Sequence, residues 1–278
     1  MLEQELTQLL GADALVIHPD DRVRYEKGYR YGDGRAAAIV RPRTVHDVSA
    51  LMRYAREAGH SLLPQGAHTG LVGAATPGAG GKHIVVSLEL LREVTIDPVG
   101  RTAVCGAGVL LSALNAAAAE HGLTLPIDLG ADPSIGGMAA ANAGGARLTR
   151  YGDMRRQTLG LQVVLADEDG TILSDMRGLR KNNVGLDLKQ MLIGTGCAGG
   201  IITAVEVELQ PVVTQAATAL VVPRSVDRIG TVLAGMERRL GPFLTACEGM
   251  SANAIAAALD HHPALPRPFA SLPPFCLL

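Results

Sequence analysis

The sequence has no tryptophan, and aromatic residues make up only 3% of its 278 residues. Proteins that bind single-stranded nucleic acid usually stack bases on aromatic side chains, so this function is disfavoured. Acidic and basic residues nearly balance, at a formal net charge of −2, and the basic residues form no long run. A basic surface for nucleic acid is therefore not expected, and no nucleic-acid partner is assigned.

Cysteine is also scarce. The four cysteines, Cys105, Cys197, Cys247 and Cys276, form no C-x-x-C pair, and no histidine cluster lies near them in the sequence. We therefore expect neither a zinc site nor a disulfide framework, and we assign no metal. No apolar stretch is long enough to span a membrane, and residues 1–10 lack the basic start of a signal peptide. These absences indicate a cytoplasmic protein, with peripheral attachment to a membrane left open.

The chain is rich in hydrophobic residues, at 47%, and contains 33 glycines, which are clustered. Thr44, a following apolar stripe and Gly59 predict a capped helix between them. Residues 11–38 and 126–145 show no regular pattern. Hydrophobic periodicity predicts the other elements. Helices are expected at 1–10, 109–121, 225–240 and 251–259, and strands at 61–64, 83–88, 93–97, 101–105, 159–166, 171–174, 200–209, 218–222 and 243–250.

Glycine-rich loops can hold a pyrophosphate, because their backbone N–H groups approach it without obstruction from Cβ atoms. Residues 106–108, G-A-G, lie between a strand and a helix but lack the third glycine and the acidic residue of a Rossmann site. Residues 194–199 read G-T-G-C-A-G but precede a strand instead of a helix. We interpret both as tight turns. The remaining candidates are residues 64–73 and 132–145.

Several segments carry a family resemblance through their order along the chain. Residues 64–73 are similar to a P-R-G-G-G-T-G loop, and residues 104–109 to V-x-x-G-A-G-V. A second loop follows, with P-S-I-G-G at 133–137 and N-A-G-G at 142–145. In this order they resemble the FAD-linked oxidases of the vanillyl-alcohol oxidase/PCMH type. The nearest branch contains D-lactate dehydrogenases, D-2-hydroxyglutarate dehydrogenases and the glycolate oxidase D subunit.

The resemblance implies an α+β fold, with a PCMH-type FAD-binding domain of two α+β subdomains followed by an incomplete α+β cap domain. We expect an N-terminal helix and lead-in at residues 1–34, the FAD-binding domain at 35–212 and a partial substrate or cap domain at 213–278. The chain is apolar up to residue 278, which would leave an unpaired strand at its end. We therefore expect that it is truncated at the C-terminus relative to the family.

The resemblance also assigns residues that contact FAD, which we expect to be bound non-covalently. Gln65 stands where the family has arginine, and Ala67 and His68 stand where it has glycines. Residues 194–200 read G-T-G-C-A-G-G in place of G-S-E-G-T-L-G. The expected contacts form three sets: Gln65, Gly66, Ala67, His68, Thr69 and Gly70; Pro133, Ser134, Gly136, Gly137, Asn142 and Gly145; and Gly200, Ile201 and Ile202.

The implied reaction is oxidation of a 2-hydroxy acid such as D-lactate, D-2-hydroxyglutarate or glycolate by hydride transfer to flavin. Electrons would pass on to a quinone, a cytochrome or another carrier. In the family, the catalytic base and any metal ligands lie largely beyond the region matched here, so no catalytic residue is named. Two alternatives stay open. The chain is an FAD-binding module without its own turnover, as a truncated form or a subunit needing a partner or a dimer, or it is a protein without flavin whose loops are structural.

Overall fold

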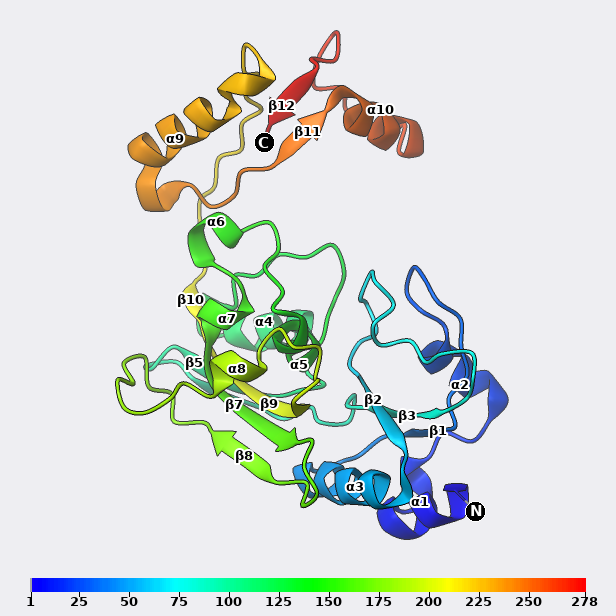
Figure 1. Cartoon of the computed structure of the whole chain (residues 1–278). Helices are drawn as coiled ribbons and strands as arrows, with labels where there is room; N and C mark the ends of the chain where they lie inside the picture. Colours follow the sequence, from blue (N-terminus) through cyan, green and yellow to red (C-terminus); the bar gives the residue numbers. More distant parts are fainter. Residues whose placement is uncertain (1) are drawn as a thin grey trace. The chain divides into compact units, whose positions relative to one another are not determined.

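The computed structural model describes residues 2–278, and these fall into two compact units (Figure 1). The first unit contains the chain up to Ala143 together with Asp153–Val212. The second contains Gly144–Gly152 and Val213–Leu278. Helices and strands mix in both, as the α+β prediction requires.

A three-stranded parallel sheet forms one part of the first unit. Its strands are β1 (Ala38–Val40), β2 (Ser61–Gln65) and β3 (His83–Ser87), in the order β1-β3-β2. The central strand β3 contains a run of three apolar residues, 84–86, and is buried on both faces, as a parallel strand requires. Helix α3 (Val45–Ala58) packs its apolar stripe into the same core as this sheet.

Helix α3 begins with a capping box, as its sequence predicts. The Thr44 hydroxyl accepts from the Asp47 N–H at 3.1 Å, and the Asp47 carboxylate accepts from the Thr44 N–H at 3.0 Å. Gly59 ends the helix in the left-handed region, at φ 72°.

We expect Thr44→Ala to lower the free energy of unfolding by about 1 kcal/mol, because one helical N–H loses its acceptor. Urea denaturation of the purified protein measures this change. Thr44→Ser keeps the hydroxyl and should unfold at nearly the urea concentration of the unmodified protein. Equal stability of the alanine and serine variants would contradict a role for the cap.

A five-stranded antiparallel sheet forms the other part of the first unit, in the order β4-β5-β9-β7-β8. Helices α4 (Leu111–Ala119), α5 (Ile135–Ala141) and α7 (Met154–Gln157) share its apolar core. The seven strands predicted up to residue 209 are confirmed to within a residue at each end. The strands of this sheet are β4 (Val94–Asp97), β5 (Thr102–Gly106), β7 (Thr158–Leu165), β8 (Ile172–Asp175) and β9 (Gly200–Glu208).

Two stretches that lack a regular sequence pattern contain helices, so that expectation is wrong. Helix α2 (Pro19–Glu26) begins with a proline in its first turn and buries only Tyr25, so no apolar stripe marks it. Helix α5 is mostly glycine and alanine. Its burial against the sheet, and not its intrinsic propensity, stabilises it.

The second unit contains a two-stranded antiparallel sheet of β11 (Gly249–Ser251) and β12 (Phe275–Leu277). Helix α9 (Ile229–Leu240) precedes it, and Ser251 caps helix α10 (Ala252–His261). The strands expected at 218–222 and 243–250 are largely wrong. Only Val221 in the first stretch forms a bridge, with Leu277, and the second consists of a turn and irregular chain before β11.

The remaining elements are short. No helix in residues 2–278 is long and apolar enough to cross a membrane. The short elements are α1 (Leu2–Leu10), α6 (Leu148–Tyr151), α8 (Lys189–Leu192), the paired strands β6 (Leu123–Thr124) and β10 (Gln210–Pro211), and the 3₁₀ turns Ala12–Ala14, Val226–Arg228 and Gly241–Phe243.

Candidate functional site

A cavity of about 570 Å³ lies in the first unit, where β2 ends and the chain enters helix α5. Its volume falls within the range of cofactor and small-molecule sites. The loop after β2 and Leu88 after β3 both contribute to its wall, so it borders the carboxyl edge of the parallel sheet. This edge is where α/β proteins usually bind ligands.

Most of the residues assigned to FAD on sequence grounds line this cavity. They come from the loop after β2, from the approach to α5 and from β9. The predicted residues in the wall are Gln65, Gly66, Ala67, His68, Thr69, Gly70, Pro133, Ser134, Gly136, Gly137 and Ile202.

Asn142 is not in the wall, because its side chain joins two helices. It ends α5 with a left-handed backbone, at φ 50°. Its amide donates to an Asp153 carboxylate oxygen at 2.7 Å and accepts from the Arg155 N–H at 2.8 Å. Gly145 belongs to the second unit and is not a wall residue either. Cofactor contact by these two residues stays a prediction.

The Gln65 side chain fastens the two ends of the loop after β2. It is only 2% exposed. Its amide donates to the backbone oxygen of Tyr25 at 2.9 Å and to that of Ala75 at 2.8 Å. The end of helix α2, the end of strand β2 and the far side of the loop are thus held at one point.

His68 makes a second attachment of the same loop. Its backbone is left-handed, at φ 57°, where the family motif has glycine. Nδ1 lies 3.2 Å from the Arg24 backbone oxygen, and Nε2 lies 3.0 Å from the Thr76 hydroxyl. Since a carbonyl only accepts, Nδ1 carries the proton. These contacts offset the strain that a side chain causes in this backbone region.

Ser134 connects the two glycine-rich segments. Its hydroxyl oxygen accepts from the Ala67 N–H and from the Gly137 N–H, both at 3.3 Å. A Cβ at Gly66 would lie 2.1 Å from this oxygen, so a side chain there is excluded. Within residues 2–278 the Ser134 hydroxyl proton has no acceptor, which leaves it for a ligand.

The loop that lines the cavity also carries free backbone donors. In the part of the chain that the structure describes, the N–H groups of His68, Thr69 and Gly70 donate to no protein atom. Consecutive free N–H groups in a wall of small residues form a concavity suited to an anion.

Sequence reasoning missed several wall residues. Tyr29 and Arg30 come from the stretch without a regular pattern, and residues 129–131 precede the second motif. Gly196 and Cys197 belong to the segment interpreted as a tight turn. No local pattern marks Arg30, because only the folded chain brings it beside the loop after β2.

Known proteins match the chain in sequence and in structure. A family described as FAD binding domain matches residues 36–175, half of the chain. The chain belongs to this family. The predicted FAD-binding family, the mixed helix-and-strand fold and FAD as the cofactor are confirmed, and the non-covalent mode of binding stays a prediction.

Curated relatives include a D-2-hydroxyglutarate dehydrogenase, mitochondrial, from Bos taurus, 38% identical over 231 residues. That match covers 82% of this chain and 42% of the relative. A D-lactate dehydrogenase from Archaeoglobus fulgidus is 38% identical over 200 residues, covering 70% of this chain and 44% of the relative. The chain therefore spans less than half the length of these relatives.

A solved alkyldihydroxyacetonephosphate synthase superposes with a TM-score of 0.75 at 18% identity. The match covers 99% of this chain and 55% of the synthase, and at this identity it shows the fold alone.

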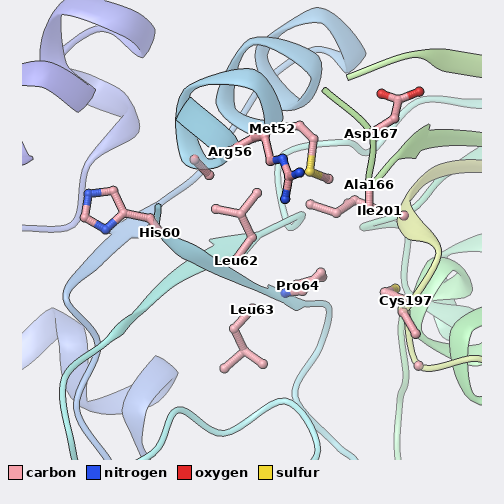
Figure 2. A pocket seen from close by; sticks show the side chains of 14 residues that line it. Met52, Arg56, His60, Leu62, Leu63, Pro64, Ala166, Asp167, Cys197 and Ile201 are labelled. Carbon is pink, nitrogen blue, oxygen red and sulfur yellow. The ribbon is translucent and has the colours of Figure 1, made fainter. Parts of the chain in front are cut away.

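The FAD-binding domain has a second cavity of about 390 Å³ (Figure 2). Figure 2 shows Met52 and Arg56 of α3, Leu62 of β2 and Ile201 of β9 around it. Two of the predicted contacts, Gly200 and Ile201, lie here and not in the first cavity. The two cavities share Pro64, Gly196 and Cys197 in their walls.

Cys197 lies in a left-handed turn, at φ 68°, where the family motif has glycine. Burial raises the pKa of its thiol, and the Ile202 N–H lowers it to a lesser degree. The thiol is therefore protonated at neutral pH and is a poor nucleophile. This agrees with its interpretation as a small residue in a tight turn.

Proposed function

We propose that this chain binds FAD non-covalently and forms the cofactor-holding part of a dehydrogenase that oxidises a 2-hydroxy acid. D-lactate, D-2-hydroxyglutarate and glycolate are the substrates considered, with a quinone, cytochrome or other carrier as electron acceptor. The observation that carries the proposal is the cavity wall. The loop after β2, which carries free N–H groups, and Ser134, whose hydroxyl proton has no acceptor among the described residues, line one space between two glycine-rich segments.

The paired cavities support an extended ligand. A dinucleotide has two bulky ends joined by a pyrophosphate, and two spaces with a common wall suit that shape. Gly200 and Ile201 line the smaller cavity, and Ile202 lines the larger one. A single ligand that extends from one cavity into the other would therefore contact all three residues. Gln65 and His68 would fix the loop that holds the pyrophosphate, which reduces the entropy lost on binding.

Bound FAD would supply the redox chemistry, as an acceptor of hydride. The chain's residues would bind it, orient it and exclude water. Both ring nitrogens of His68 are engaged, with Arg24 and Thr76, and the Cys197 thiol has a raised pKa. Neither side chain is thus an available nucleophile, which supports non-covalent binding.

An FAD-binding module without its own turnover is the second candidate. Proton abstraction from a hydroxy acid needs a base. Among the described residues of the first cavity wall, none is aspartate, glutamate or lysine, and the ring nitrogens of His68 are engaged. A partner subunit or a second copy of the chain would then complete the site.

The absorbance spectrum of the purified protein, before and after incubation with FAD, tests cofactor binding. We expect oxidised-flavin bands that pass into the supernatant after acid precipitation. Flavin that stays with the precipitate would contradict non-covalent binding, and absence of flavin after reconstitution would contradict the proposal as a whole.

Dye reduction separates the two functional candidates. A flavin-loaded protein that reduces a dye with D-lactate, D-2-hydroxyglutarate or glycolate supports the dehydrogenase. A flavin-loaded protein that reduces none of them supports the module.

Localisation stays a prediction of a cytoplasmic protein with peripheral membrane attachment left open, although the name of the Bos taurus relative says mitochondrial. Separation of a cell lysate into cytosolic, membrane and mitochondrial fractions tests it.

A further inference from the structure

The wall of the larger cavity contains a single fixed charge among the residues that the structure describes. That charge is the guanidinium of Arg30, and the other wall residues are apolar or uncharged apart from His68. Within residues 2–278, the Arg30 side chain makes no hydrogen bond, ion pair or ring contact. An unpaired cation beside an apolar cavity favours a ligand with negative charge.

A tight hairpin holds Arg30 at this position. The Gly28 N–H donates to the Gly32 backbone oxygen at 2.9 Å, and the Gly34 N–H donates to the Glu26 backbone oxygen at 3.1 Å. A Cβ at Gly28 would lie 2.8 Å from the Thr76 hydroxyl, so the hairpin packs directly on the chain near Thr76.

The same Thr76 hydroxyl contacts His68, at 3.0 Å from Nε2. Helix α2, which leads into the hairpin, is tied to Gln65 through the Tyr25 backbone oxygen at 2.9 Å. The hairpin that carries Arg30 and the loop that carries the free N–H groups are therefore both held by contacts with Thr76 and Gln65. A cation and a row of backbone donors are thus held at one cavity.

We infer that Arg30 binds an anionic group of the ligand in this cavity, either the pyrophosphate of the dinucleotide or the carboxylate of a hydroxy acid. The inference rests on the proposed function and names the residue that recognises the charge. The uncharged Gln65 side chain in the loop after β2 is engaged in hydrogen bonds with the backbone oxygens of Tyr25 and Ala75. Arg30 supplies from the hairpin a charge that the loop lacks, and its planar guanidinium can donate two hydrogen bonds to either group.

The test compares the unmodified protein with Arg30→Gln, Arg30→Lys and Lys27→Gln, each freed of flavin and titrated with FAD and with riboflavin. Lys27→Gln is the matched control, because Lys27 is exposed on the same hairpin but does not line the cavity. Thermal melting of each flavin-free protein confirms that it is folded. Quenching of flavin fluorescence measures the dissociation constants.

If Arg30 binds the pyrophosphate, Arg30→Gln weakens FAD binding about 10-fold or more, since a hydrogen bond to a charged group is lost. Riboflavin, which has no phosphate, then binds all four proteins equally. Arg30→Lys falls between the glutamine variant and the unmodified protein, and Lys27→Gln matches the latter.

If Arg30 binds the carboxylate, FAD affinity is unchanged in Arg30→Gln. The dissociation constant of D-lactate or D-2-hydroxyglutarate, read from the spectrum of the bound flavin, then rises about 10-fold. Equal binding of FAD and of both hydroxy acids by Arg30→Gln and the unmodified protein overturns the inference, as does equal weakening in Lys27→Gln. Failure of the unmodified protein to bind FAD refutes the proposed function itself, and the inference falls with it.

Discussion

Replacement of Gly136 by valine is expected to abolish FAD binding and to lower the free energy of unfolding by about 3 kcal/mol. A Cβ at Gly136 would lie 2.5 Å from the Ala107 Cβ and 2.9 Å from the Ala107 oxygen. The Gly136 N–H donates to that same oxygen at 3.0 Å, so the two backbones are already in contact. A side chain at this point has to push α5 away from the tight turn formed by residues 106–108.

That turn cannot move to relieve the clash. A Cβ at Gly106 would lie 2.4 Å from the Leu91 oxygen, and a Cβ at Gly108 would lie 2.1 Å from the Leu88 oxygen. The turn is thus packed on both sides, and Leu88 belongs to the cavity wall. Displacement of α5 would therefore also displace Ser134 and the loop that it connects.

Chemical denaturation and FAD titration of Gly136→Val measure the two effects. Gly230→Val is the control, because a Cβ at Gly230 meets no atom within 4 Å and Gly230 lines neither cavity. We expect the control to unfold near the denaturant concentration of the unmodified protein. If Gly136→Val matches the control in both measurements, the close contact between α5 and the turn is not essential.

Local sequence signals predicted the elements whose own residues determine them. Helix α3 has both an apolar stripe and caps, and β3 is a β-branched run, so each is recognisable in isolation. Helix α2 buries only Tyr25 and leaves Val23 exposed, and α5 lacks a stripe because glycine and alanine fill most of it. The sheet stabilises α5 from outside its own sequence, so no local signal marks it.

The candidate site divides in the same way. The order of the motifs predicted that residues 64–73 and 132–145 serve one ligand, and the structure places residues 64–73 and part of residues 132–145 in one cavity wall. The motifs could not indicate that the Asn142 side chain joins α5 to α7, because that depends on the distant Asp153. They also could not indicate Arg30, whose position depends on the packing of a hairpin on Thr76. Side-chain direction and non-local packing decide both cases.

Replacement of Gln65 by leucine is expected to lower the free energy of unfolding by about 2–4 kcal/mol, because one buried and one partly buried acceptor lose their donor. Those acceptors are the backbone oxygens of Tyr25 and Ala75, at 2.9 and 2.8 Å from the Gln65 amide nitrogen. Leucine has a similar volume, so lost packing contributes little. The loop between Gly66 and Ala75 would then be held mainly through His68 and Ser134.

A loosened loop has to be ordered when FAD binds, so we expect FAD affinity to fall by at least about 10-fold in Gln65→Leu. In the flavin-free Gln65→Leu variant, hydrogen exchange in residues 66–76 should be faster than in the unmodified protein, while exchange in strand β3 should be unchanged. The matched control is Gln8→Leu, since Gln8 is exposed on α1 and its side chain makes no hydrogen bond among the described residues. Unchanged exchange in the loop together with unchanged FAD affinity would show that Gln65 does not position it. A loss of stability with unchanged exchange and affinity would limit Gln65 to anchoring helix α2, and His68 alone would then hold the loop on that side.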